Sequence, residues 1–385
     1  MKAKLINFIK ANRIIYSVIS FFYRLFFNFI GLFCRTKKQI IFTSFGGRKF
    51  DDSPYALYKK IISDNFFRDY RIIWAFTNPK SYKLTRGEVV KIDTFKFFIS
   101  LMKSKIWISN TSIDRGIGLR KRGVVRVETW HGTPLKKICG EENSLTFKPK
   151  KRRKIDDKTI RCAQSEYDQE IFARVFNASK KCIHICDLPR NDELVHKISL
   201  AEKSELLKNV GIPEHKKIIL YMPTYREYLL DDKYNNFIAP PLHLDLWKQE
   251  LGEEYIVLFR SHYVVNKVLG IKTDNFIIDV SDFPHLNTLF LISDILISDY
   301  SSAFFDFCIT EKPMICFAYD LKEYSEKRGL YLDLQKQFID VCEKEDELLL
   351  NIKNIKNQSK KFREKFAPNP GNATAKIIAE IKKRL

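Results

Sequence analysis

Short apolar runs alternate with stretches of helical spacing from residue 39 onward, in two successive series. A short apolar run between polar residues is typical of a strand buried on both faces, as strands of parallel sheets are. The predicted strands lie at 39–45, 71–76, 89–92, 106–109, 124–129, 160–163 and 182–185, and then at 217–222, 255–259, 276–279, 295–297, 314–317 and 338–341. Because helices separate these strands, the sequence predicts an α/β fold with two parallel sheets, each covered by helices on both faces.

Helical stretches occupy the intervals between the strands. They lie at 54–63, 94–103, 165–176, 245–251, 285–291 and 302–308, and a last helix, 374–385, follows the breaker Pro368-Asn-Pro-Gly371. The polar stretch 191–213 is the predicted join. The predicted domains are therefore 39–205 and 206–370, preceded by residues 1–38 and followed by the helix 371–385. Ligands of such sheets bind at the carboxyl ends of the strands, so two facing sheets would share one cleft.

Residues 1–38 form a separate basic and aromatic segment. The apolar stretch 14–33, flanked by lysine and arginine, is about long enough to span a bilayer. Arg24 and Asn28 near its middle disfavour a simple membrane span. No small-residue cleavage site is evident, which disfavours a signal peptide that is removed. The favoured interpretation is a helix in the membrane interface whose basic flanks contact anionic headgroups. A helix buried against the domain and a true span are the alternatives.

The charge balance indicates an anionic partner. The chain of 385 residues has 67 lysines and arginines against 46 acidic residues, a formal charge of +21. Nucleic acid, anionic lipid or an acidic substrate would fit this excess. The basic run 148–154 suits either a solvated loop or a loop at an anionic membrane or polymer, and no nucleic-acid recognition motif accompanies it. The eight cysteines are scattered, which favours reduced thiols in a cytoplasmic protein over disulfides or a metal site.

A histidine follows the predicted strand 124–129. His131 precedes Gly132, which permits an unusual turn, and Pro134, which suits the start of a helix. A histidine at a strand end can act as a general base at neutral pH. A structural histidine is the alternative at this position.

Candidate phosphate ligands follow three predicted strands of the second series. Thr224 and Arg226 follow the first of them, and Arg260 and His262 follow the next. Arginine suits bidentate contact with phosphate, and an arginine and a histidine two residues apart could clamp a diphosphate. Ser301 and Ser302 precede an apolar helical stretch, where hydroxyl and backbone N–H groups attract phosphate; a helix cap with no ligand is the alternative. Farther along, Glu323 and Glu326 could hold ribose hydroxyls.

Several common motifs are missing from the sequence. It has no Gly-x-x-x-x-Gly-Lys-Ser/Thr loop, no Gly-x-Gly-x-x-Gly after a strand, no Gly-x-Ser-x-Gly elbow and no Asp-x-Asp. The sequence therefore disfavours a P-loop nucleotidase and a dinucleotide enzyme. It also lacks the usual metal-binding signature of one large class of glycosyltransferases. Transfer from a nucleotide diphosphate without a metal needs arginine, histidine and hydroxyl groups to stabilise the leaving phosphate, and this chain has those groups at strand ends.

The motifs together resemble one family. His131-Gly-Thr-Pro-Leu-Lys136, Tyr221-Met-Pro-Thr-Tyr-Arg226, Arg260-Ser-His262 and Ser298-Asp-Tyr-Ser-Ser302 occur in this order. Over about residues 39–370 the chain resembles the CDP-glycerol glycerophosphotransferases, the primases and polymerases of wall teichoic acid and related capsule enzymes. The resemblance implies a GT-B-type fold of two facing Rossmann-like domains. It also implies metal-independent transfer of glycerol phosphate or ribitol phosphate from a CDP-polyol to a hydroxyl of a membrane-linked acceptor, with no cofactor.

The resemblance also implies roles for single residues. His131 would deprotonate the acceptor hydroxyl, and His262 is the second predicted catalytic residue. The predicted donor and phosphate ligands are Thr224, Arg226, Arg260, Ser301 and Ser302, with Glu323 and Glu326 as ribose or polyol contacts and Thr133 and Lys136 on the acceptor side.

The predicted function is thus that of a peripheral enzyme at the cytoplasmic face of a bacterial membrane. Its expected partners are a CDP-polyol, a lipid-linked saccharide or polyol-phosphate acceptor and an anionic membrane surface, with no nucleic acid and no metal. Two other hypotheses stay open: a glycosyltransferase of the same fold that uses a nucleotide sugar, and a non-enzymatic protein, either a basic membrane-attached scaffold or a nucleic-acid binder, that uses the cleft only to sense a ligand.

Overall fold

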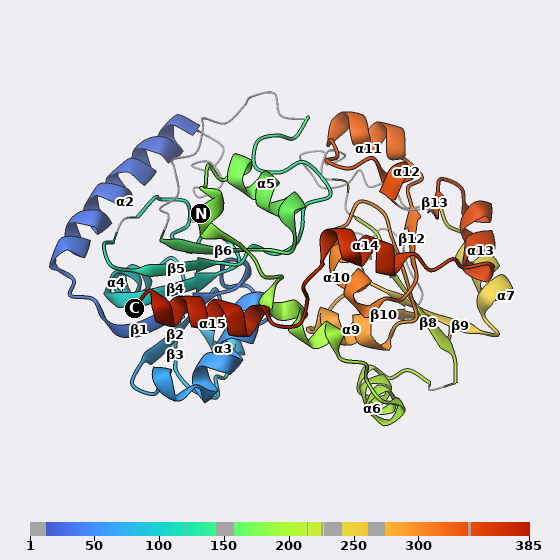
Figure 1. The fold of residues 1–385 in the computed structure, drawn as a ribbon, viewed down its shortest axis with the longest axis horizontal. Coiled ribbons are helices and arrows are strands. Elements are labelled where there is room, and N and C mark those ends of the chain that lie inside the picture. The colour runs from blue at the N-terminus through green and yellow to red at the C-terminus, as the bar shows by residue number, and fades with distance from the viewer. Residues whose placement is uncertain are drawn as a thin grey trace, which may run out of the picture. The chain divides into compact units, whose positions relative to one another are not determined.

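The computed structural model contains two parallel sheets (Figure 1). It describes residues 13–119, 121–143, 158–213, 215–224, 226, 241–260, 274–337 and 340–385. The first sheet has the strand order β3-β2-β1-β4-β5-β6-β7 and the second the order β10-β9-β8-β11-β12-β13. Each strand pair with a described register is parallel. The predicted α/β fold with two parallel sheets is confirmed.

The strands of the first sheet are β1 (Lys37–Thr43), β2 (Arg71–Phe76), β3 (Glu88–Lys91), β4 (Ser104–Ser109), β5 (Val125–Glu128), β6 (Thr159–Ala163) and β7 (Ile183–Ile185). Those of the second are β8 (Lys217–Met222), β9 (Tyr255–Phe259), β10 (Ile277–Asp279), β11 (Ile295–Ser298), β12 (Met314–Phe317) and β13 (Val341–Cys342).

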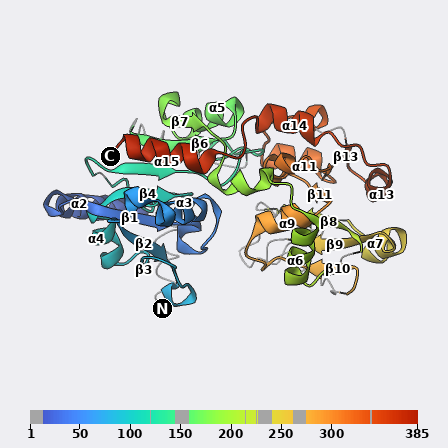
Figure 2. The same cartoon turned by 60° about the horizontal axis from the view of Figure 1, so that its bottom comes forward.

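The described α-helices surround these sheets (Figures 1 and 2). They are α2 (Arg13–Phe33), α3 (Asp52–Ser63), α4 (Phe95–Lys103), α5 (Glu166–Val175), α6 (Leu200–Val210), α7 (Leu244–Leu251), α9 (Leu286–Ile292), α10 (Ala303–Phe307), α11 (Leu321–Lys327), α12 (Leu334–Gln337), α13 (Glu345–Lys353), α14 (Ser359–Phe366) and α15 (Ala373–Lys383). A 3-10 helix, η5 (Pro189–Val195), precedes α6.

Alternate side chains of each strand pack against helices on opposite faces of the sheet. In the second sheet, Ile219 and Ile297 share one cluster with Trp247 of α7. Their neighbours Leu220 and Leu296 belong to the cluster of α9 and α10 on the other face. Burial on both faces explains why these strands are continuously apolar, with each fully buried aliphatic side chain contributing about 1.5–3 kcal/mol.

The structure corrects several predicted elements. The last predicted strand, 338–341, overlaps the observed strand β13 only at residue 341. Residues 338 and 339 lie outside the described part of the chain, and residue 340 precedes the strand. The predicted helix 302–308 ends at Phe307, where a 3-10 turn begins. Helices α13 and α14 were not predicted, because helices of only 9 and 8 residues span too few turns to give a clear periodic pattern.

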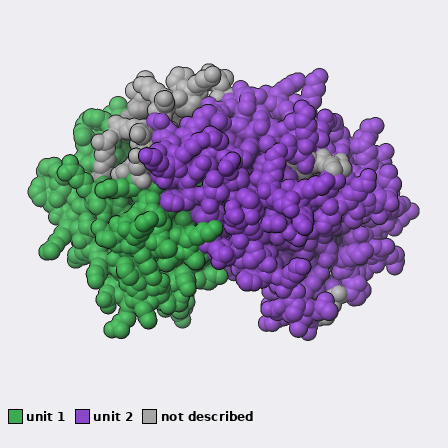
Figure 3. Space-filling model, in the orientation of Figure 1, with its two compact units in different colours: residues 1–131, 156–162, 374–385 green, residues 132–155, 163–373 purple. Residues whose placement is uncertain are grey.

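The chain forms two compact units, which Figure 3 colours separately. The first contains residues 1–131, 156–162 and 374–385, and the second contains 132–155 and 163–373. The C-terminal helix α15 belongs to the first unit, where Lys382 and Asp64 form an ion pair of 2.7 Å. The predicted domain boundaries after residues 38, 205 and 370 stay a prediction.

Helix α2 has two different faces. Phe27 is buried, and its ring stacks on Phe98 of α4 with the centroids 4.4 Å apart. A second set of large apolar side chains is exposed: Val18, Phe21, Phe22, Tyr23, Leu25, Phe26, Phe29, Leu32 and Phe33. No helix in the described part of the chain has both the length and the apolarity that crossing a membrane requires.

Candidate functional site

His131 lies where two neighbouring strands of the first sheet end. It follows β5, and its Nδ1 is 3.0 Å from the backbone carbonyl oxygen of Asn110, which directly follows β4. The ring also stacks on Trp130 at 4.1 Å between centroids. A backbone oxygen only accepts hydrogen bonds, so Nδ1 carries the proton in the neutral ring and Nε2 carries the lone pair. This is the tautomer that a general base requires.

Gly132 approaches Ser302 closely within the second unit. Its φ is +142°, and an added Cβ would lie 2.8 Å from Ser302 Oγ. Only glycine fits this position, because a side chain would meet both a strained backbone and the serine.

Thr133 is a buried residue of the turn that follows His131. Its hydroxyl lies 2.7 Å from Gln164 Oε1 and 3.0 Å from Asp168 Oδ2. Burial raises the pKa of Asp168 to about 6, although several hydrogen bonds oppose that rise. Thr133 thus anchors the turn after His131, and its predicted acceptor role stays a prediction.

The turn between β11 and α10 is held by its own polar side chains. Ser298 Oγ donates to the backbone oxygen of Met222, and Asp299 accepts from the backbone N–H of Thr224 at 2.9 Å. Ser301 Oγ accepts from Ala303 N at 3.1 Å. The predicted ligands Thr224, Ser301 and Ser302 therefore lie at the ends of the paired strands β8 and β11.

Arg226 is enclosed by carboxylates and aromatic rings. Its guanidinium forms a 2.8 Å ion pair with Asp299 and a bidentate pair with Asp320, and the side chain is fully buried. The rings of Tyr300, Tyr319 and Tyr324 lie 4.9–5.0 Å from its Cζ. Burial alone would lower the pKa of Arg226, but the two carboxylates raise it overall. Arg226 thus links the ends of β8, β11 and β12, and its predicted role in shaping a donor pocket stays a prediction.

Arg260 contacts backbone oxygens in the described structure. Its NH1 donates to the carbonyl oxygens of Val280 and Phe283 at 2.8 and 2.7 Å. These bonds hold the segment that follows β10 against the end of β9. His262 lies outside the described residues, so its predicted role and that of Arg260 stay predictions.

The segment after Leu135 pairs with the segment after α11. The backbone of Lys136 forms an antiparallel bridge with Leu330, and Tyr331 N donates to Leu135 O at 2.9 Å. Asn143 Nδ2 donates to the carbonyl oxygens of Ser325 and Glu326. These contacts join residues almost two hundred positions apart in sequence.

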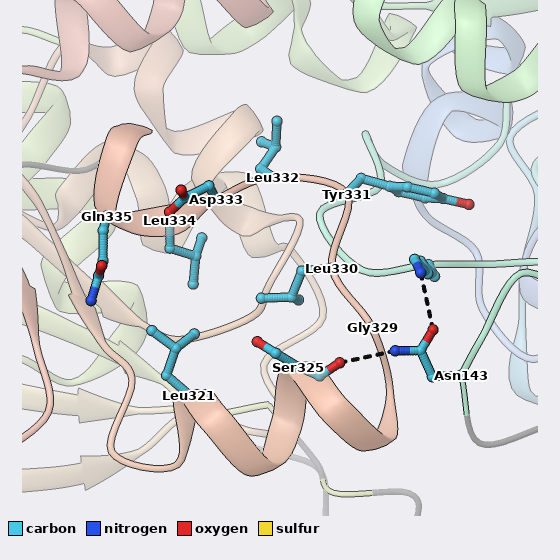
Figure 4. A pocket seen from close by; sticks show the side chains of 11 residues that line it. Asn143, Leu321, Ser325, Gly329, Leu330, Tyr331, Leu332, Asp333, Leu334 and Gln335 are labelled. Carbon is cyan, nitrogen blue, oxygen red and sulfur yellow. Dashed lines mark hydrogen bonds between the residues drawn. The ribbon is translucent and has the colours of Figure 1, made fainter.

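A pocket of about 430 Å³ lies beside these two paired segments (Figure 4). Its apolar lining comes from leucines at 321, 330, 332 and 334, and its polar lining includes Lys137, Asn143 and Ser325. Glu323 and Glu326 are not among the lining residues. Glu323 pairs instead with Lys327 at 2.6 Å, so the predicted ribose contacts stay predictions.

A cluster of polar side chains around η5 was not predicted from the sequence. Arg190 NH2 is 2.6 Å from Asp306 Oδ2, and Asn191 Nδ2 is 2.8 Å from Asp306 Oδ1. Of the run Pro189-Arg-Asn-Asp192, only Asn191 and Asp192 fall within the predicted join 191–213, and a proline and an arginine soon after a strand, Pro189 and Arg190, are the signal that could have identified the cluster. Among the described residues no group of three or more His, Cys, Asp or Glu could hold a metal ion, and metal independence stays a prediction.

Comparison with known proteins identifies the family. The model of the family "CDP-Glycerol:Poly(glycerophosphate) glycerophosphotransferase" matches residues 25–375. A teichoic acid poly(glycerol phosphate) polymerase of Bacillus spizizenii is 31% identical over 93% of this chain and 95% of its own length. A teichoic acid glycerol-phosphate transferase of Staphylococcus aureus is 32% identical over 78% of this chain and 79% of its own. The chain spans about half of a longer Staphylococcus epidermidis polymerase, 47%, at 32% identity.

Solved structures agree with this assignment. The wall teichoic acid polymerase TagF has a TM-score of 0.83 at 29% identity, covering 94% of each chain. A variant of TagF soaked with CDPG has a TM-score of 0.82. A UDP complex of Staphylococcus aureus MnaA has a TM-score of 0.51 at 14% identity, which indicates a shared fold alone. The resemblance seen in the motifs is confirmed: the chain belongs to the CDP-glycerol:poly(glycerophosphate) glycerophosphotransferase family.

Proposed function

We propose that this chain transfers glycerol phosphate from CDP-glycerol to a hydroxyl of a teichoic-acid-type acceptor. The main observation behind this proposal is the orientation of the His131 ring. Its Nδ1 faces the Asn110 carbonyl oxygen at 3.0 Å, so in the neutral ring Nε2 has the lone pair. The relatives support glycerol as the polyol. Six relatives named for glycerol phosphate align over 61–93% of the chain, whereas two ribitol-phosphate polymerases align over 44% and 43%.

In the proposed reaction, His131 Nε2 takes the proton of the acceptor hydroxyl while that oxygen attacks the phosphorus atom that bears glycerol. A new P–O bond forms, the bond from this phosphorus to the bridging oxygen breaks, and CMP leaves. Arg260, His262, Ser301 and Ser302 are the proposed contacts of the diphosphate, because N–H and O–H donors stabilise its growing negative charge. No metal ion or cofactor enters this proposal.

The proposed architecture is a GT-B-type pair of facing domains at the cytoplasmic face of the membrane. The exposed aromatic face of α2 supports membrane contact, since Phe22, Phe26 and Phe29 recur at helical spacing. Arg35, Lys37 and Lys38 follow the helix and would contact anionic headgroups. The acceptor is accordingly proposed to be lipid-linked.

Substitution of His131 tests the function directly. We expect His131→Ala to lower CMP release by about 10²–10⁴-fold, the usual contribution of a general base. CDP-glycerol affinity, measured by calorimetry, should stay almost unchanged, because the base acts on the acceptor. His196→Ala, which removes an exposed histidine, is the matched control. Full turnover in His131→Ala would exclude the base role.

A further inference from the structure

The backbone around Arg190 is held rigidly by neighbouring segments of the second unit. Asn287 Nδ2 donates to the Arg190 carbonyl oxygen at 2.6 Å. Asn191 Nδ2 donates to Asp187 Oδ1 at 3.1 Å as well as to Asp306. Ala373 N donates to Asp192 Oδ1 at 2.8 Å. The backbone that carries the Arg190 side chain is therefore held in place, as a precise ligand contact requires.

The guanidinium of Arg190 is also oriented. Its NH2 lies 2.6 Å from Asp306 Oδ2, and 13% of its side chain is exposed against 4% for Asp306. The carboxylate thus fixes one edge of a guanidinium that still reaches solvent. A planar guanidinium held in this way is pre-organised for phosphate oxygens.

Arg190 and Ser302 converge on the same point beside Gly132. A Cβ added to Gly132 would lie 2.8 Å from Ser302 Oγ and 3.5 Å from Arg190 NH2. Ser302 Oγ and Arg190 NH2 therefore lie at most 6.3 Å apart, close enough for both to contact one diphosphate. Because Gly132 has no side chain, it covers neither the Ser302 hydroxyl nor the Arg190 guanidinium.

One carboxyl of the cluster, that of Asp187, is only partly ionised near pH 7. Burial raises the pKa of Asp187 to about 7, opposed by hydrogen bonds from Leu188 and Asn191. Near pH 7 about half of the Asp187 carboxyls are therefore protonated, so Asp187 carries less negative charge than an ordinary aspartate.

We propose that Arg190 is a donor-binding residue that contacts the diphosphate next to Ser302. This inference rests on the proposed function and adds a residue to the donor site that the sequence motifs did not include. Its alternative is a purely structural role, in which Arg190 only ties η5 to α10 through Asp306.

Calorimetric titration of four proteins separates the two roles: the wild type, Arg190→Gln, Arg190→Lys and Asp306→Asn. A charge-assisted hydrogen bond to phosphate predicts that Arg190→Gln weakens CDP-glycerol binding at least about tenfold and leaves cytidine binding unchanged. Arg190→Lys should recover part of the affinity. Asp306→Asn retains the guanidinium and should lose less affinity than Arg190→Gln. Arg174→Gln removes another paired arginine of the second unit and serves as the control.

Two results would overturn the inference. One is wild-type affinity in Arg190→Gln, and the other is equal losses in Arg190→Gln and Asp306→Asn together with equal losses of thermal stability. If the wild type does not bind CDP-glycerol, the proposed function fails, and a titration with pyrophosphate then decides the inference separately. Pyrophosphate binding that depends on Arg190 supports it, whereas binding that is absent or independent of Arg190 contradicts it.

Discussion

At the scale of single residues, Arg226 is a motif residue whose guanidinium is bound on two sides by carboxylates. Its charge is shared between Asp299 and Asp320, and its faces are covered by tyrosine rings. A buried arginine of this kind is stabilising only while its partners remain, since each unpaired buried charge is costly. The cluster couples three strand ends and so determines where the serines of the following turn lie.

Arg226→Met is therefore expected to destabilise the second unit by about 3–5 kcal/mol, because it leaves two carboxylates without their partner. The measurement is the midpoint of denaturant unfolding, followed by fluorescence. Arg174→Met is the matched control: it breaks a bidentate pair with Glu141 whose arginine is 53% exposed, and such pairs contribute about 1 kcal/mol or less. Similar losses in the two variants would contradict this account of the cluster.

At the scale of elements, α2 combines a narrow packed face with a broad exposed one. Phe27 belongs to the core cluster of the first sheet, together with Phe98 and Leu101 of α4. Lys121 Nζ donates to the carbonyl oxygens of Gly31 and Cys34 at the end of the helix. The helix is thus attached to the first unit through one face while its opposite face remains apolar.

Replacing Phe22, Phe26 and Phe29 with serine should weaken binding to anionic vesicles at least about tenfold, because the three aromatic side chains that would insert into the membrane interface are lost. Thermal stability should hardly change, since all three side chains are exposed. Co-sedimentation with phosphatidylglycerol vesicles measures the effect. Phe66→Ser, another exposed phenylalanine of the first unit, is the control. Undiminished vesicle binding by the triple variant would disprove the membrane role of α2.

At the scale of the whole molecule, the buried carboxyls link stability to pH. The folded-state pKa of Asp187 lies near 7, above its unfolded value of about 3.8, because burial disfavours the charged form. A raised acid pKa means that the folded state binds the proton more tightly. The stabilising contribution is therefore complete below about pH 4 and is lost as the pH rises to about 7.

Asp187→Asn should gain stability relative to the wild type as the pH rises from 4 to 8, by an amount on the order of 2–4 kcal/mol. The measurement is the difference in melting temperature between variant and wild type across that range. Using the difference removes the contributions of the other titrating groups. Asp245→Asn, at an exposed position of α7, should give a flat difference, and a flat line for Asp187→Asn as well would refute the linkage.

The amino-acid sequence by itself determined the two parallel sheets and the family. Apolar runs such as 217–222 and 295–297 can be recognised locally, because burial on both faces requires an uninterrupted apolar segment. The motif around His131 is local as well. Tertiary structure alone decided the partners of the polar residues. Arg226 meets Asp320, Arg190 meets Asp306, and Leu135 pairs with Tyr331, across separations from 94 to 196 positions. No periodic pattern encodes such contacts, because they depend on which strand ends the parallel topology places side by side.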